Sequence, residues 1–442
     1  MLKTLRNAWA VPELRKKIVF TVFILLIYRL GCQIPVPFID PETLKLIQAS
    51  YAGEGTILEY LNILSGDAFQ KASLFALSIS PYITASIVMQ LLTIAIPALE
   101  RMSKEGPEGK KKIDRITRYV TVALGTITAY GYYTYLKASI PQGGYDLLVK
   151  GTGLNDTFMM IVIIACYSAG AALIMWMGEK INAHGIGNGI SMILFANIIS
   201  GMPGLAMTAV TWCGDGVFGI IKTIVVAIVL LLLVAFVVFI TNSERRITVQ
   251  YAKKVVGRKM YGGQSTNLPI KLNMSGVMPI IFANSIVALP GTIGLMFGKN
   301  AETATGFWGG FLRVFNYTSP VYIVIFAVLI VAFSYFYIAI SFNPVEVSNN
   351  LRNNGGFVPG IRPGKPTSDY ITKILNKVTL MGAMFLGVIA VLPLIVNLIP
   401  NLGLGSMAFS GSSLLIVIGV ALETVRDLEA QITMRHYKGF LE

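Results

Sequence analysis

Long apolar runs alternate with short polar stretches along the whole chain. Ten runs of about 20 residues, the length that crosses a hydrocarbon core of about 30 Å, can be marked in the sequence. This pattern predicts an all-α polytopic membrane protein with ten transmembrane helices. The approximate limits of the runs are 18–35, 74–97, 117–137, 154–178, 186–208, 217–241, 272–297, 317–342, 378–396 and 411–430.

The second run carries an unusual number of polar side chains between residues 78 and 93. At about 100° per residue, Ile79, Ile83 and Ile87 fall on one stripe with Gln90 below them. Pro81 is expected to free the carbonyl group of Leu77 from its helical partner. An apolar stripe flanked by small hydroxyl side chains suggests the wall of a cavity. The alternative is an ordinary bundle helix in which Ser and Thr bond to neighbouring helices.

Composition excludes a soluble globular class. Of the 442 residues, 54% are hydrophobic and only 13% are charged. Most of the predicted spans lack ionisable residues at mid-membrane, although proton- or ion-coupled transporters and intramembrane enzymes normally carry them there. The sequence contains two histidines, three cysteines without metal spacing, and none of the HExxH or GxSxG motifs. We therefore expect no catalytic activity, no cofactor and no metal.

The basic residues give the orientation. With a cytoplasmic N-terminus, 28 of the 36 Lys and Arg residues lie in the inside segments. Topology accounts for this excess, so a nucleic-acid function is not required. The sequence therefore predicts a multi-pass protein with both termini in the cytoplasm, and an uncleaved first span.

Three connecting segments are too distinctive to be simple links. The outside segment 36–73 contains a short amphipathic piece, residues 57–64, which is either re-entrant or a helix on the outer surface. The inside segment 242–271 alternates as a β-hairpin would, and the inside segment 343–377 is rich in Pro and Gly, with Arg362 at its tip. Shaped basic loops of this length favour a docking site for a cytoplasmic partner.

Five separated motifs identify a family. They are SISPYITASI at 78–87, KEG at 104–106, GIGNGIS at 185–191, QSTNLP at 264–269 and FVPGIRPG at 357–364. With them the chain resembles the SecY family, the central subunits of bacterial protein-conducting channels, over essentially its whole length. The resemblance implies passage of unfolded secretory polypeptides across the bacterial plasma (inner) membrane and lateral release of hydrophobic segments into it.

The resemblance also implies an architecture. It predicts two inverted five-helix halves, 18–208 and 209–430, around an hourglass pore, with a cytoplasmic N-terminal segment 1–17 and a cytoplasmic tail 431–442. A re-entrant plug helix at about 57–72 would fill the outer funnel. The waist would be a ring of apolar side chains, Ile79, Ile83, Leu194, Ile281 and Ile416.

Two further sites follow from the same resemblance. A lateral gate between spans two and three and spans seven and eight would include Ile87, Gln90, Asn284 and Ser285. Docking of a motor or ribosome would use Arg245, Arg246, Lys253, Lys254, Arg258, Lys259, Arg362 and Lys365. The implied partners are the subunits SecE and SecG, the ATPase SecA or a translating ribosome, signal peptides and preproteins, and membrane lipids.

Two other classes of function fit the sequence less well. A secondary transporter could also place a proline and serines in a broken helix, but the ion-free spans disfavour it. A lipid-modifying membrane enzyme would need a nucleophile beside a base, for which the sequence offers no candidate.

Overall fold

The computed structural model describes residues 2–40, 43–44, 62, 65–138, 146–148, 155–214, 216–251, 254–256, 259–261, 265–296, 306–315, 319–397 and 410–438. These form two compact units. Unit 1 comprises Met1–Thr223, Asn284–Ile323 and Pro393–Glu442, and unit 2 comprises Ile224–Ala283 and Val324–Leu392.

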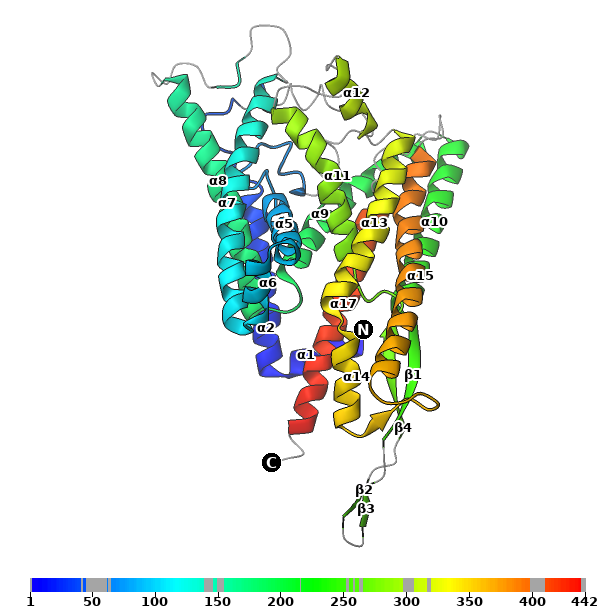
Figure 1. Cartoon of the computed structure of the whole chain (residues 1–442). Coiled ribbons are helices and arrows are strands. Elements are labelled where there is room, and N and C mark those ends of the chain that lie inside the picture. The colour runs from blue at the N-terminus through cyan, green and yellow to red at the C-terminus, as the bar shows by residue number, and fades with distance from the viewer. Residues whose placement is uncertain are drawn as a thin grey trace. The chain divides into compact units, whose positions relative to one another are not determined.

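A helix overlaps each of the ten predicted spans (Figure 1). These helices are α2 (Pro12–Gly31), α5 (Ser80–Ala95), α7 (Pro107–Ala138), α8 (Asp156–His184), α9 (Gly189–Gly214), α10 (Val217–Asn242), α11 (Met278–Met296), α13 (Pro320–Ser341), α15 (Lys365–Asn397) and α17 (Ser410–Lys438). Four shorter helices accompany them, α1 (Leu2–Ala10), α6 (Pro97–Lys104), α12 (Gly306–Val314) and α14 (Pro344–Asn353).

Several of the described helices have the length and surface expected of membrane spans. Five are long and apolar enough to cross a bilayer, and the pair α5 and α6, bent by 99° at Ile96, adds a sixth candidate. Their large apolar side chains face outward in several places, as with Leu231 and Phe239 of α10, which are 69% and 72% exposed. Such exposure is stable when lipid rather than water covers it.

The start of α5 differs from the prediction. The helix begins at Ser80 rather than near residue 74, so Pro81 lies in its first turn and frees no helical carbonyl group within it. Ala72 and Ser78 have positive φ angles of 45° and 52°, which an α-helix does not accommodate. The preceding apolar residues therefore form turns instead of a helix.

The core of unit 1 is aromatic. Helices α5, α7 and α8 pack against one another, and α2 packs on α8. Tyr132 of α7 and Tyr167 of α8 meet edge to face with their ring centroids 5.1 Å apart, and Phe69 lies 4.6 Å from Tyr132. Gly170 lets the backbone of Leu74 approach α8, because a Cβ there would lie 2.0 Å from the Leu74 carbonyl oxygen.

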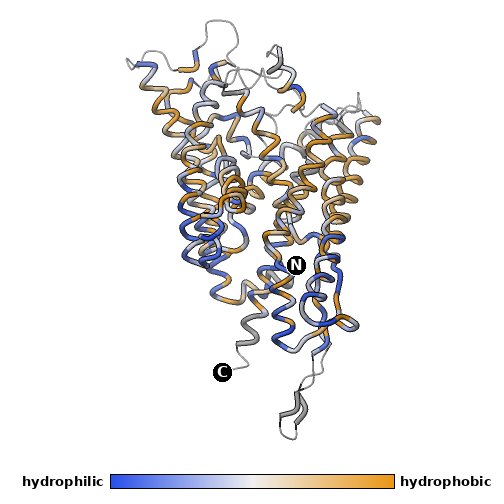
Figure 2. Tube along the Cα trace, in the orientation of Figure 1, coloured by the Kyte–Doolittle hydropathy of each residue, from blue (hydrophilic) through white to orange (hydrophobic). Residues whose placement is uncertain are grey.

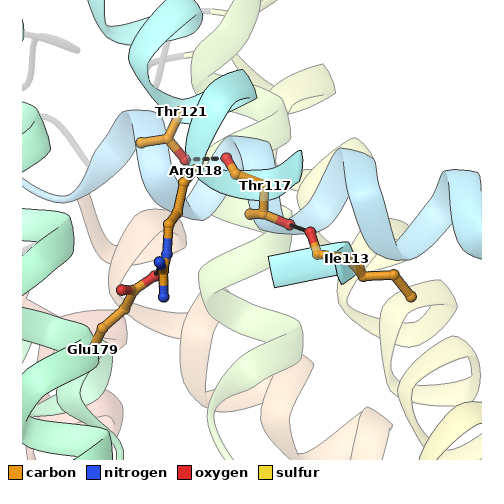
Figure 3. A network of polar contacts seen from close by, with 5 residues as sticks. All are labelled: Ile113, Thr117, Arg118, Thr121 and Glu179. Atoms are coloured by element: carbon orange, nitrogen blue, oxygen red, sulfur yellow. Dashed lines mark hydrogen bonds and ion pairs between the residues drawn. The ribbon is translucent and has the colours of Figure 1, made fainter. Parts of the chain in front are cut away.

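An ion pair joins the first half of α7 to the last turns of α8. Arg118 Nε donates to Glu179 Oε1 at 2.8 Å (Figure 3). On the same helix, Thr117 and Thr121 bond back to the carbonyl oxygens of Ile113 and Thr117. These hydroxyl groups are satisfied within α7, so the helix buries them without an unpaired donor.

The glycine-rich turn between α8 and α9 connects four helices of unit 1. Gly187 has a φ of 72°, and its amide donates to Asp427 Oδ2 of α17 at 3.3 Å. The Ile186 amide donates to Thr21 Oγ1 of α2 at 3.1 Å. A Cβ at Gly189 would lie 2.0 Å from the Gly178 carbonyl oxygen, which makes glycine necessary there.

Unit 2 contains the predicted hairpin. Strand β1 (Glu244–Tyr251) pairs antiparallel with β4 (Ser265–Lys271), and with β5 (Gly356–Phe357) on its other side. Strands β2 (Lys254–Val256) and β3 (Lys259–Tyr261) extend the hairpin toward its tip. Figure 2 shows apolar residues along α10, α13 and α15 and polar residues where β1 and α14 begin. Ile247, Val249 and Ile270 pack with Ile338, Val358 and Leu375, which anchors the sheet on α13 and α15.

The segment 343–377 is shorter as a loop than predicted. Asn343 caps α14 by accepting hydrogen bonds from the amides of Val345 and Glu346, and α15 already begins at Lys365. The shaped loop is therefore confined to 354–364. The tail 431–442, predicted as a separate segment, continues α17 as far as Lys438.

Candidate functional site

The isoleucine stripe of α5 is buried along its length. Ile79, Ile83 and Ile87 are 1%, 6% and 3% exposed. Ile79 is the residue before the first helical turn, and its Cδ1 atom lies 3.8 Å from where a Cβ on Gly178 would be. The side chain of Ile79 is thus directed toward α8, at the end of the stripe where the helix begins.

The other predicted ring residues are also buried. Leu194 and Ile416, on α9 and α17 of unit 1, are each 2% exposed, and these two helices pack against each other. Ile281 is 4% exposed and belongs to unit 2. Burial of all five aliphatic side chains is compatible with a closed apolar constriction and with a packed core, so the ring stays a prediction.

The residues before α5 form a compact turn structure, which we call the outer-turn segment (65–79). Of the predicted plug at 57–72, residue 62 and residues 65–72 are described; residues 57–61, 63 and 64 lie outside the described part of the chain. Asn62 bonds to Asp67 and to the amide of Gln70, and Ser65 Oγ accepts from the amide of Phe69. The segment is therefore ordered by its own polar side chains.

Backbone strain is concentrated in the outer-turn segment. Asp67, Ala72 and Ser78 have φ angles of 68°, 45° and 52°, although none is glycine. A non-glycine residue in this region costs on the order of 1–2 kcal/mol, so the segment needs partners that hold it there.

Those partners come from α2, α7, α8 and α9, all in unit 1. Tyr132 OH donates to the Phe69 carbonyl oxygen, and Tyr167 OH donates to that of Ala72 at 3.3 Å. Arg29 Nη1 donates to the Gly66 carbonyl oxygen at 2.7 Å. Asn197 Nδ2 donates to Ser78 Oγ at 3.3 Å, and Asn197 is fully buried. We call Arg29, Tyr132, Tyr167 and Asn197 the outer-turn clamp.

The outer-turn clamp was not predicted from the sequence. Its members lie on four different predicted spans, far apart in the chain. A signal did exist, because an arginine near the end of an apolar helix and an asparagine inside one are costly in lipid unless each has a partner.

The predicted lateral-gate residues occupy two helices. Gln90 is partly buried, and its Nε2 donates to Ser86 Oγ of the same helix at 3.4 Å. On α11, Asn284 is 5% exposed, and its Nδ2 has no hydrogen-bond partner among the described residues. Ser285 is partly buried beside it. A buried donor without a partner costs about 1–3 kcal/mol, so α11 carries a polar group that a change of environment would stabilise.

The predicted docking loop is rigid, and its basic side chains are exposed. Thr367 Oγ1 donates to the Arg362 carbonyl oxygen at 2.8 Å, and Ser348 Oγ donates to that of Gly364 at 2.7 Å. Gly360 and Gly364 have φ angles of 81° and 101°, which only glycine adopts readily. Arg362 and Lys365 are exposed on this fixed backbone.

The predicted docking residues of the hairpin are only partly described. Arg245 is exposed, and Arg246 Nε forms an ion pair of 2.7 Å with Glu244. Lys254 and Lys259 lie on the paired strands β2 and β3. Lys253 and Arg258 lie outside the described residues.

Comparisons with known proteins identify what this arrangement resembles. The family model SecY matches residues 73–425. The protein translocase subunit SecY of Streptomyces galbus is 40% identical over the full length of both chains. A solved SecY structure, whose plug domain is reported to stabilise the closed state of the channel, superposes on this chain with a TM-score of 0.66 at 17% identity. The match covers 94% of this chain and 92% of that one. Sec61 from a canine ribosome–channel complex superposes with a TM-score of 0.63 at 16% identity and the same coverage.

Proposed function

The chain belongs to the SecY family, and on that premise we propose how its residues conduct a polypeptide. It is a polytopic membrane protein that forms a protein-translocation channel and is not an enzyme. The observation that carries the assignment is the 40% identity to a translocase subunit over the whole of both chains.

The proposed constriction is the apolar ring of Ile79, Ile83, Leu194, Ile281 and Ile416. An extended polypeptide must pass without ions or water following it. A narrow ring of branched aliphatic side chains excludes water when empty, and it holds no particular side chain of the substrate when filled. The burial of all five side chains supports this proposal. The halves 18–208 and 209–430 would surround this ring.

The plug is proposed to be residues 57–72, which include the first part of the outer-turn segment. The plug must stay closed at rest and must leave when a chain enters. Strain at Asp67 and Ala72 favours leaving, and the hydrogen bonds that Arg29, Tyr132 and Tyr167 of the outer-turn clamp donate to this part favour staying. A difference of a few kcal/mol between two such arrangements is within what binding of a substrate can overcome.

Lateral release is proposed to occur where α5 and α11 carry polar side chains. Gln90 and Asn284 would exchange partners when the seam opens and a hydrophobic segment enters. The unpartnered Nδ2 of Asn284 supports this step, because opening would let it bond to water or to the substrate backbone. Ile87 and Ser285 would line the same seam. Membrane lipid would then receive the released segment.

The energy source is proposed to be a partner that docks on Arg362, Lys365 and the β1–β4 hairpin. The candidates are the ATPase SecA and a translating ribosome, with SecE bracing the channel and SecG at its periphery. The similarity to Sec61 in a ribosome–channel complex supports the ribosome as a partner. Signal peptides and preproteins would be the substrates. Exposed arginine and lysine on a rigid loop suit contacts with carboxylates or phosphates.

The membrane is proposed to be the bacterial plasma membrane, with both termini in the cytoplasm. The bacterial source of the S. galbus relative supports the first point. The cytoplasmic position of both termini is supported by the excess of basic residues in the segments before the first predicted span and after the even-numbered spans.

Reconstitution tests the proposal. Liposomes that contain this chain with SecE are expected to import a preprotein when SecA and ATP are supplied, and to protect it from external protease. Liposomes with SecE alone are the control. Equal protection in both, at matched protein content, would contradict the proposed function.

A further inference from the structure

The glycine-rich turn between α8 and α9 bonds to both the first and the last of the predicted spans. The Ile186 amide donates to Thr21 Oγ1 of α2, and the Gly187 amide donates to Asp427 Oδ2 of α17. The turn carries one of the five family motifs, yet none of its residues belongs to the ring, the gate or the docking loop. We call the turn 185–189, with Lys17, Thr21, Asp427 and Gln431, the 185–189 joint.

Asp427 is the centre of the hydrogen bonds in this joint. Its Oδ2 atom accepts from the Gly187 amide at 3.3 Å and from Gln431 Nε2 at 3.2 Å. The Oε1 atom of Gln431 in turn accepts from Lys17 Nζ at 3.0 Å. A continuous series of hydrogen bonds therefore runs from α2 through α17 to the turn. Bonds to a carboxylate or from an ammonium group are charge-assisted, and they are stronger than bonds between neutral groups.

An apolar cluster accompanies these hydrogen bonds. Four side chains from α1, α2, the turn and α17 pack together and are at most 3% exposed, namely Ala8, Leu14, Ile186 and Leu428. Beside the turn, Thr424 Oγ1 of α17 lies 3.6 Å from Met192 Sδ of α9, and these two helices pack against each other. Separating such a contact is costly, because it would expose apolar side chains and leave paired polar groups without partners.

The 185–189 joint connects the two proposed halves of the channel. Helix α2 and the turn belong to 18–208, whereas the joint residues of α17 belong to 209–430 or directly follow it. The proposed lateral gate has fewer polar contacts to lose. Asn284 Nδ2 has no hydrogen-bond partner among the described residues, and the bond of Gln90 stays within its own helix. Opening at the gate residues therefore breaks less than opening at the joint.

We propose that Asp427 is a positioning residue, which keeps the 185–189 joint closed throughout transport so that the two halves turn about the joint and separate at the lateral gate. The inference rests on the proposed function, because it needs two halves that move. If the joint opened with the gate instead, each transport cycle would break the hydrogen bonds of Asp427 and expose Leu14 and Leu428. A joint that stays closed avoids both costs.

Covalent closure of the joint tests the proposal. The three native cysteines are replaced by Ser, Met192→Cys and Thr424→Cys are introduced, and a short bis-methanethiosulfonate reagent bridges the two thiols. The chain is reconstituted with SecE, and import of a cysteine-free preprotein is driven by SecA and ATP. We expect the bridged channel to import as well as the same channel after the bridge is reduced. A block of import that reduction reverses overturns the proposal.

Removal of the carboxylate is the second test. Asp427→Ala is expected to assemble with SecE and to raise the resting ion conductance at least about tenfold, since it deletes charge-assisted hydrogen bonds that hold the halves together. Bridging Met192→Cys to Thr424→Cys in this background should return the conductance to that of the parent chain, and reduction should restore the leak. Glu429→Ala, at an exposed residue of the same helix, is the matched control and should not leak.

A resting conductance of Asp427→Ala equal to that of the control, or a leak that persists after bridging, overturns the proposal. If Asp427→Ala does not assemble, the bridge in the chain that retains Asp427 decides alone. Failure of the proposed function would appear earlier, as absence of import by the cysteine-free chain before any bridge is formed.

Discussion

At the scale of single residues, buried aliphatic and polar side chains have opposite roles in this channel. In the proposed mechanism, the ring residues act through what they exclude, because branched hydrocarbon side chains leave no hydrogen-bond partner for water in a narrow pore. The outer-turn clamp makes specific hydrogen bonds, three of them to backbone carbonyl groups and one to the Ser78 hydroxyl group. Substitutions in the two sets should therefore fail in different ways.

Replacing Ile83 and Ile281 with Ser tests the ring. The double variant is expected to assemble normally and to conduct ions at rest, because a polar constriction stays wet. Conductance in planar bilayers is the readout, measured with the plug intact and deleted. Val88→Ser, on the exposed face of α5, is the control. If the double variant conducts no more than the control, both with the plug intact and with the plug deleted, Ile83 and Ile281 contribute only to packing.

Arg362→Glu tests the docking loop. The backbone around Arg362 is fixed by Thr367, so the substitution reverses a charge without altering the fold. We expect normal insertion and SecE binding, with at least about a tenfold loss of SecA-driven transport, since a charge-assisted contact becomes a repulsion. Lys373→Glu, at a residue that is also exposed on α15, makes the same charge change outside the loop. Similar transport by the two variants would show that only net charge matters.

At the scale of elements, most helices could be predicted from hydrophobic length, but their ends could not. The start of α5 is set by positive φ angles at Ala72 and Ser78, which tertiary contacts impose. The hydropathy of the sequence contains no information about these tertiary contacts. The helix α14 did carry a local signal, because Asn343 followed by Pro344 is a capping residue before a proline at the first helical position. The hairpin was predictable, since its alternation marks one buried face.

The outer-turn segment is expected to loosen when its clamp is removed. Tyr132→Phe together with Tyr167→Phe deletes two buried hydrogen bonds to its backbone, each worth about 1 kcal/mol. The resting channel should open roughly thirtyfold more often in single-channel recordings, since the two losses together are about 2 kcal/mol. Tyr130→Phe, on the exposed side of α7, is the control. An unchanged open probability in the double variant would show that the clamp has no role in gating.

At the scale of the whole molecule, the sequence predicted the membrane class and orientation, and the resemblance supplied the site. The distribution of charge and the hydropathy can be read along the sequence without knowing how the helices pack. Leu194 and Ile416 have no local feature that distinguishes them from other core residues. They became candidates only through the resemblance to the family. The outer-turn clamp consists of residues far apart in the chain, so it could be recognised only in the structure.

The orientation is directly testable. In a chain whose three native cysteines are replaced by Ser, Lys71→Cys should react with an impermeant thiol reagent in intact cells. Asn353→Cys should react only after the membrane is permeabilised. Both residues are exposed in the structure, so lack of reaction reports the membrane side and not burial. The reverse pattern would invert the proposed topology.

The most direct measurement of the central claim places a photoreactive side chain at Ile83 while a preprotein is arrested halfway through the channel. The account predicts cross-linking of Ile83 to the arrested chain, at whichever preprotein residue occupies the constriction, and none from Val88 on the exposed face of α5. Cross-linking of Ile83 only to other helices of the channel, while the preprotein is demonstrably arrested across the membrane, would contradict it.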